Sequence, residues 1–227
     1  MATRPARGRE VSARGSARRR RSRVPAACLV VFVVVWVALA IAPSDRADWL
    51  LENIATVVAL PFAIRAYRRG ALDDVAWVEV TLFALLHTVG SHYTYTEVPL
   101  GDWLRDALDL SRNHYDRVVH FLFGVLMVRP IRQLFAGEAR GWRPNYIAVA
   151  TVAFISVLYE TTEWLVASVA DPAAGTAYLG TQGDEWDAIK DMALACGGAV
   201  LSATVDVLLL GRGRRARAKT RRHTVTG

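Results

Sequence analysis

Six apolar stretches alternate with polar segments along this chain of 227 residues. A transmembrane helix needs about 20 mostly apolar residues, and each stretch approaches or reaches that length. The pattern predicts helices over Val24–Ala42, Trp49–Tyr67, Val75–His92, Tyr115–Val128 with an extension to Leu134, Tyr146–Val169 and Asp187–Leu210. We therefore expect an all-α, polytopic membrane protein whose six transmembrane helices form a bundle.

The two ends of the chain differ from this centre. Residues 1–23 are rich in Arg, Ala and Ser and contain too few apolar side chains to form a core, so we expect a disordered tail there. Residues 212–227 form a second basic tail. The six-helix transmembrane domain should therefore cover residues 24–211.

Positive charge is distributed unevenly around the predicted helices. Most of the 28 Lys and Arg residues lie in the two tails and in the segments Arg65–Arg69 and Arg129–Arg143. Because basic residues collect on the cytoplasmic side of membrane proteins, both termini are predicted to be cytoplasmic. The net charge of +7 comes from these flanks and not from a basic groove, so the expected partner is the lipid bilayer and not a nucleic acid.

The first predicted helix has a second interpretation. A basic leader, an apolar run and the small residues Ala38-Leu39-Ala40 are also typical of a cleaved signal peptide. The apolar run is longer than the usual signal core of about 7–15 residues. We therefore expect this helix to be retained.

The longest outer loop, Ser91–His114, contains one further helical pattern. Over Asp102–Leu110 the apolar residues, Trp103 among them, fall on one side and the charged residues on the other. Such a segment can lie in the headgroup layer of the membrane. A simple connecting helix and a lid over a site are both compatible with this pattern.

Ionisable residues interrupt four of the apolar stretches, always at the end predicted to face outward. A charged side chain at mid-bilayer costs about 2.5–3.5 kcal/mol even on a lenient scale, so these groups should face one another, water or a ligand. We expect a polar pocket that opens toward the outer face. The candidate catalytic residues in it are His87, His92, Asp116, His120, Glu160, Glu163, Asp187 and Asp191.

The spacing of these residues leaves three chemistries open. Asp116 and His120 are four positions apart and share a helix face, as do Asp187 and Asp191. Carboxylates and imidazoles on facing helices can bind a divalent metal such as zinc, iron or manganese. A His–carboxylate pair can instead act as a general acid or base, or the polar groups can simply join the helices.

A metal is therefore an open alternative rather than a required cofactor. Its candidate ligands are His87, His120, Glu160, Glu163, Asp187 and Asp191. Residues near the outer ends of the helices are candidates to bind a ligand such as a phosphate. These candidates are Asn113, His114, Arg117, Gln182 and Asp184, with Arg112 and Lys190 as further cations.

Longer strings within residues 75–201 carry a family resemblance. They are HTVGSHYTY from His87, VP from Val98, RNHYDR from Arg112, HF from His120, Glu160, EW from Glu163, GTQGD from Gly180, WD from Trp186 and DM from Asp191. In these strings the chain resembles the YjdF-type bacterial inner-membrane proteins. The resemblance implies a multi-pass protein of the bacterial cytoplasmic membrane and supplies no reaction.

A weaker likeness is to the VanZ-like membrane proteins, which are linked to tolerance of glycopeptide antibiotics. It rests on DRVVHF from Asp116, on Glu160, and on Asp187 and Asp191 before Gly197-Gly198-Ala199. The chain departs from that pattern at Glu163-Trp164, where a Gln is more usual, and lacks the Asn before the glycines.

Together these patterns favour one function over two others. We expect an outward-facing His/Asp/Glu site that binds or modifies an envelope lipid or its headgroup. A proton-coupled transporter or channel is one alternative, although no inverted repeat or broken helix supports it. A structural or partner-binding membrane protein is the other. No oligomeric state is predicted.

Overall fold

The computed structural model describes residues 22–135, 142–169 and 179–223. All regular secondary structure in these segments is helical, as predicted. The helices are α1 (Val24–Leu39), α2 (Arg46–Arg69), α3 (Asp74–His92), α4 (Pro99–Ala107), α5 (Tyr115–Phe135), α6 (Arg143–Val169) and α8 (Asp187–His223). The predicted disordered tail lies outside this description except for Ser22 and Arg23.

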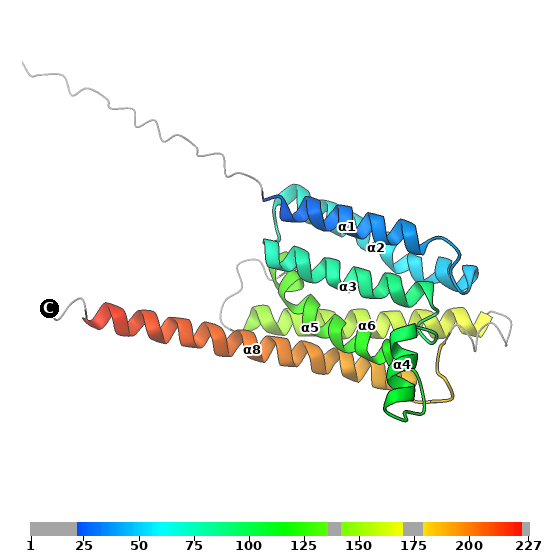
Figure 1. Cartoon of the computed structure of the whole chain (residues 1–227). Coiled ribbons are helices and arrows are strands. Elements are labelled where there is room, and N and C mark those ends of the chain that lie inside the picture. Colours follow the sequence, from blue (N-terminus) through cyan, green and yellow to red (C-terminus); the bar gives the residue numbers. More distant parts are fainter. Residues whose placement is uncertain (1–21, 136–141, 170–178, 224–227) are drawn as a thin grey trace, which may run out of the picture.

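The long helices lie side by side and the short α4 crosses one end of them (Figure 1). Helix α5 packs against α3, α6 and α8, and α1 packs against α3. The start of α1 and the end of α8 lie at the same end of the bundle, opposite α4 (Figure 1). We call the end with α4 the α4 end.

Local signals in the sequence explain where the first helices begin and end. The carboxylate of Asp45 accepts hydrogen bonds from the backbone N–H groups of Ala47 and Asp48 and so caps α2. Gly70 ends α2 with a φ of 58°, which glycine adopts without strain. Asp73 caps α3 in the same way as Asp45 caps α2, through the N–H of Ala76.

Small residues bring α5 and α8 together. A side chain on Gly124 would collide with the backbone of α8 at Ala195 and Ala199, and one on Gly198 would collide with the carbonyl oxygen of Phe121. Around this contact the core is built from buried apolar residues of α5, α6 and α8, with Ala148, Val152 and Met127 among them. Close packing of small residues is a common way to join helices inside a membrane.

Two ion pairs join the helices at the end opposite α4. The Arg129 guanidinium binds the carboxylate of Asp73, with Nη2 2.6 Å from Oδ2. Arg132 binds Asp206 and also donates a hydrogen bond to Asn145 Oδ1 over 3.1 Å. These contacts fix α5 against the start of α3 and against α6 and α8.

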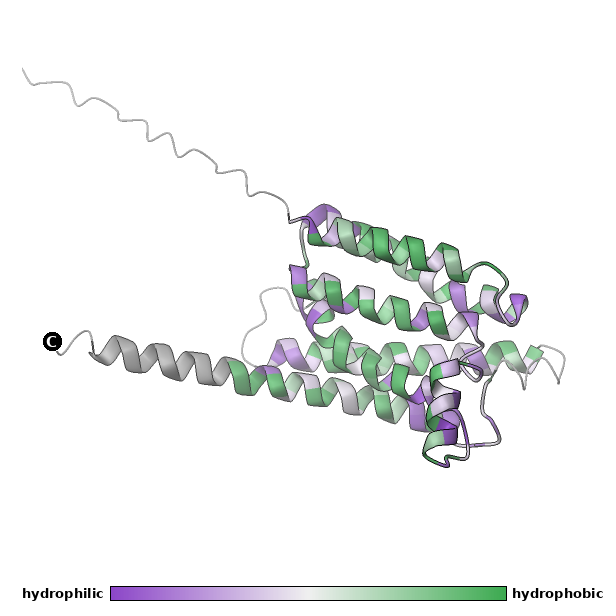
Figure 2. Ribbon diagram, in the orientation of Figure 1, coloured by the Kyte–Doolittle hydropathy of each residue, from purple (hydrophilic) through white to green (hydrophobic). Residues whose placement is uncertain are grey.

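The helices have the composition of membrane spans. Four helices of the described segments are long and apolar enough to cross a membrane: α2, α5, α6 and the Asp187–Leu209 part of α8. Many of their large apolar side chains point outward, and the apolar middle sections are flanked by more polar ends (Figure 2). The prediction of an all-α membrane protein is thus confirmed. Helix α1 is apolar but shorter, with 16 residues, and α3 falls outside this group.

One helix ends where its predicted extension does and another runs beyond its prediction. Helix α5 continues past Val128 through Pro130 to Phe135, one residue after the predicted extension to Leu134. The last predicted helix ended at Leu210, whereas α8 continues to His223. Arg, Ala and Lys dominate this extension, and all three favour helix, so apolar content alone placed the boundary too early.

Candidate functional site at the α4 end of the bundle

An ion network connects α5, α8 and the two loops that precede them. Arg112 binds both carboxylate oxygens of Asp187, and its Nη1 also donates to the Thr181 carbonyl over 3.1 Å. Arg117 binds Asp187 as well, with Nη2 3.1 Å from Oδ1, and also binds Asp184. Charge-assisted, two-pronged bonds of this kind fix geometry strongly.

Asn113 and Gln182 join the same two loops through their amides. The Gln182 side chain donates to the Asn113 carbonyl and accepts from the Asn113 N–H, each over 3.0 Å. The Asn113 side chain donates to the Val98 carbonyl over 3.0 Å and to Asp102 Oδ1 over 3.1 Å, which ties α4 to the bundle. Both residues were predicted to bind a ligand. In the structure their side chains join the two loops to each other and to α4.

Next to the ion network, acidic side chains of α5, α6 and α8 converge. One oxygen each of Asp116, Asp187 and Asp191 lies within 4.8 Å of the others. Nε2 of His120 lies 3.4 Å from Asp116 Oδ1 and 3.4 Å from Glu160 Oε1. We call these five residues the acidic cluster. Two charges 4.8 Å apart repel by about 3 kcal/mol at an effective dielectric constant of 20, so the cluster needs cations or protons.

Glu163 belongs to the margin of this cluster. Its carboxyl group lies close enough to that of Glu160 for the two to share a hydrogen bond when one of them carries a proton. Beyond it, the Tyr159 hydroxyl donates to Glu52 Oε2 over 2.6 Å, and the Tyr159 ring lies 5.9 Å from the His120 ring between centroids. A continuous band of polar groups therefore extends from α8 across α6 to α2.

The two remaining predicted residues form bonds of a different kind. His87 has both ring nitrogens occupied, Nδ1 by the Tyr95 hydroxyl at 2.5 Å and Nε2 by the Glu52 carbonyl at 3.2 Å. His92 Nδ1 bonds to the Leu39 carbonyl over 2.7 Å and holds the end of α1. Both ring nitrogens of His87 are therefore engaged, and a metal could bind His87 only if one of these bonds were broken.

Sequence reasoning missed Glu52 and Tyr159. The signal for Glu52 was present, because it lies near the start of α2, at the same end of the bundle as the other polar residues. Nothing in the spacing distinguished Tyr159 from an ordinary aromatic residue. The sequence suggested Arg112 as a phosphate-binding cation, whereas in the structure its guanidinium forms an ion pair with Asp187.

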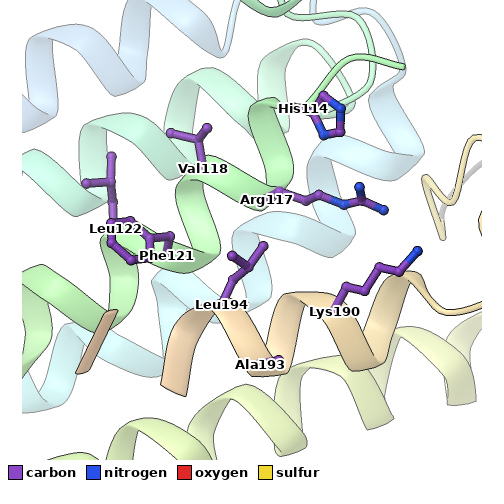
Figure 3. A pocket seen from close by; sticks show the side chains of 8 residues that line it. All are labelled: His114, Arg117, Val118, Phe121, Leu122, Lys190, Ala193 and Leu194. Atoms are coloured by element: carbon purple, nitrogen blue, oxygen red, sulfur yellow. The ribbon is translucent and has the colours of Figure 1, made fainter. Parts of the chain in front are cut away.

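A groove lies beside the acidic cluster, between α5 and α8, with a volume of about 730 Å³. Its walls are apolar and its end carries the basic side chains, as Figure 3 shows. The lining residues are His114, Arg117, Val118, Phe121, Leu122, Lys190, Ala193 and Leu194. Partial burial and the neighbouring Arg117 and Arg112 lower the pKa of His114, so its ring is neutral at pH 7. The positive charge at this end therefore comes from Arg117 and Lys190.

The apolar helices and the polar site near one end of them define an integral membrane protein of the helical type. The chain belongs to the family described as "Predicted membrane protein (DUF2238)", whose model matches residues 24–212. It is similar to the "Inner membrane protein YjdF" of Escherichia coli strain K12, with 31% identity over 186 residues that cover 81% of this chain and 87% of the relative.

This match confirms the predicted YjdF-type family and supports a multi-pass protein of the bacterial cytoplasmic membrane. The VanZ-like resemblance is not supported by it. No solved structure matches the chain.

Proposed function

We propose that this protein binds an anionic envelope lipid by its headgroup, at a site that opens toward the outer face of the membrane. The observation that carries the proposal is the groove between α5 and α8, which combines apolar walls with a basic end. A phospholipid has the same two parts in the same order. The acyl chain would lie along Val118, Leu122 and Leu194, and the phosphate would meet Arg117 and Lys190 (Figure 3).

The basic side chains at the groove retain donors for a phosphate. The Lys190 side chain is 48% exposed and holds Asp184 Oδ2 at 2.6 Å with one of its three protons. Nε of Arg117 also has no hydrogen-bond partner within the described residues, but it is buried, so Lys190 supplies the donors that a phosphate in the groove could reach. At this end Arg112 and Arg117 pair mainly with Asp187 and Asp184, and Lys190 pairs with Asp184 alone, so Lys190 is the cation with protons left for an anion.

The groove and the acidic cluster share a wall. Arg117 lines the groove and binds Asp187, which is a member of the cluster. Any chemistry on the headgroup would therefore use the cluster, and His120 is the member best suited to exchange a proton near neutral pH. This arrangement favours a headgroup site over a channel at mid-membrane.

The outward orientation requires that the chain cross the membrane six times. Helices α1 and α3 would complete the count that α2, α5, α6 and α8 begin. With six crossings, the uneven distribution of Arg favours both termini in the cytoplasm and the α4 end outside. A partner lipid in the outer leaflet follows from that orientation.

Lipid retention by the purified protein tests the proposal. The full chain in neutral detergent is mixed with phosphatidylglycerol or phosphatidylcholine, and the bound lipid is counted by native mass spectrometry. We expect a preference for phosphatidylglycerol that falls about fivefold in Lys190→Gln, because one basic residue near a membrane surface contributes about 1 kcal/mol. Arg105→Gln, which removes an exposed cation of α4, is the matched control.

A second pair of variants tests the apolar part. Ala193→Trp fills the groove and should reduce the retention of both lipids, whereas Val200→Trp, on an exposed site of α8 outside the groove, should not. Equal retention of the two lipids by the unmodified protein, unaffected by Lys190→Gln or Ala193→Trp, would refute the proposal.

A further inference from the structure

The acidic cluster contains carboxylates that lack partners although they are buried. Asp191 is 2% exposed, and its Oδ1 has no hydrogen-bond partner in the parts of the chain that the structure describes. Glu160 is 7% exposed, and the same holds for its Oε1. Buried acceptors are nearly always satisfied in native proteins, so two such oxygens in one cluster indicate a ligand that binds there.

Short distances connect both of these residues with His120 and Asp116. Glu160 Oε1 lies 3.4 Å from Nε2 of His120, which in turn lies 3.4 Å from Asp116 Oδ1. An oxygen of Asp191 lies within 4.8 Å of an oxygen of Asp116. Three carboxylates and one imidazole from α5, α6 and α8 are thus linked by short distances into one connected group.

Asp187 is near this group but is already neutralised. Both of its oxygens accept hydrogen bonds from Arg112, and Oδ1 also accepts from Arg117. It is therefore a poor metal ligand, and we assign it to holding the start of α8 in place. Asp116, Glu160 and Asp191 have no comparable bonds to Arg or Lys within the described residues.

We propose that Asp116, His120, Glu160 and Asp191 bind one divalent metal ion. Three carboxylates and one imidazole are hard to borderline donors, which suit Mn²⁺, Fe²⁺ or Zn²⁺ better than a thiolate-seeking metal. A divalent cation also neutralises most of the negative charge of the three carboxylates, which one imidazole cannot do alone. The inference rests on the cluster and stands apart from lipid binding in the groove.

The test is the metal content of the purified full-length protein. The chain is purified without chelator, incubated with Mn²⁺ or Zn²⁺, freed of excess metal and analysed by inductively coupled plasma mass spectrometry. We expect about one ion per chain, and less than about a tenth of that in Asp191→Asn, Glu160→Gln and His120→Asn. Glu79→Gln, which changes an intramembrane carboxyl of α3 toward the opposite end, is the control and should keep the metal.

A second measurement on the unmodified protein guards against variants that fail to fold. Addition of Mn²⁺ or Zn²⁺ to EDTA-treated protein should raise its melting temperature, and in a folded Asp191→Asn protein the rise should disappear. Absence of both stoichiometric metal and a thermal shift in the unmodified protein would overturn the proposal and leave shared protons as the means of neutralising the cluster. Full metal content in the three ligand variants would overturn it as well.

Discussion

Arg112 binds both carboxylate oxygens of Asp187, although the two residues are 75 positions apart in the chain. Each side chain is only 5% exposed. The pair joins the loop before α5 to the first residue of α8, and it thereby determines how the groove and the acidic cluster lie relative to each other.

Asp187→Asn should lower the free energy of unfolding by about 3–5 kcal/mol, because it leaves the Arg112 guanidinium buried without its main partner. Chemical unfolding of the protein in detergent micelles measures this change. Asp106→Asn is the control, since that carboxylate pairs with Arg105 on the surface and is 71% exposed. Its effect should stay within about 1 kcal/mol. Equal effects of the two substitutions would contradict the assigned role of the Arg112–Asp187 pair.

Neighbouring glycines of α8 should respond in opposite ways to the same substitution. Gly198→Ala places a methyl group against the Phe121 carbonyl oxygen and should destabilise the protein by about 1–3 kcal/mol. Gly197→Ala meets open space and should be neutral or stabilising by up to about 1 kcal/mol, because alanine favours helix. The same unfolding assay compares them. A loss of stability in Gly197→Ala equal to that in Gly198→Ala would mean that α5 and α8 do not approach as closely as described.

Asp184, at the basic end of the groove, should make a pH-dependent contribution to the stability of the folded protein. Lys190, together with the Trp186 N–H and Arg117, lowers the pKa of Asp184 from 3.8 to about 2. A carboxyl whose pKa is lowered on folding stabilises the protein above its ordinary pKa, and this stabilisation is lost as the pH falls toward the folded value. The difference in melting temperature between the unmodified protein and Asp184→Asn should therefore shrink between about pH 4 and about pH 2. A difference that stays constant over this range would contradict these contacts.

Reporter fusions test the orientation on which the outward site depends. A reporter at Gly227 should be active in the cytoplasm, and one inserted within residues 96–109 should be active outside, because the Arg-rich segments are retained on the cytoplasmic side. Insertion near Asp106 on the exposed face of α4 limits disturbance of the fold. Activity on the same side of the membrane at both points would exclude the outward orientation.

Much of the fold could be predicted from the sequence because membrane helices have a strong local signal. Apolar runs located the six long helices of the described segments, and the amphipathic pattern after Pro99 located α4. Local spacing also placed Asp116 and His120 on one face of α5, where Nε2 and Oδ1 lie 3.4 Å apart.

The hydrogen-bond and ion-pair partners of the polar residues could not be predicted from the sequence. Whether His87 faces the acidic cluster depends on how the loop after α3 folds back, and that loop brings the Tyr95 hydroxyl to within 2.5 Å of Nδ1. The pairing of Arg112 with Asp187 likewise depends on two loops that meet only in three dimensions. Depth in the membrane can be inferred from sequence, whereas the choice of partner at a given depth requires the tertiary structure.

Photo-crosslinking with a lipid tests the central claim most directly. The protein is reconstituted with phosphatidylglycerol that carries a diazirine on one acyl chain, irradiated, digested and mapped by mass spectrometry. Lipid bound in the groove should label Val118, Leu122 and Leu194 in preference to exposed positions of α2 such as Val57 and Val58, and excess unlabelled phosphatidylglycerol should suppress this labelling. Labelling spread evenly over the groove and the exposed face of α2, with no suppression by the unlabelled lipid, would contradict a specific lipid site between α5 and α8.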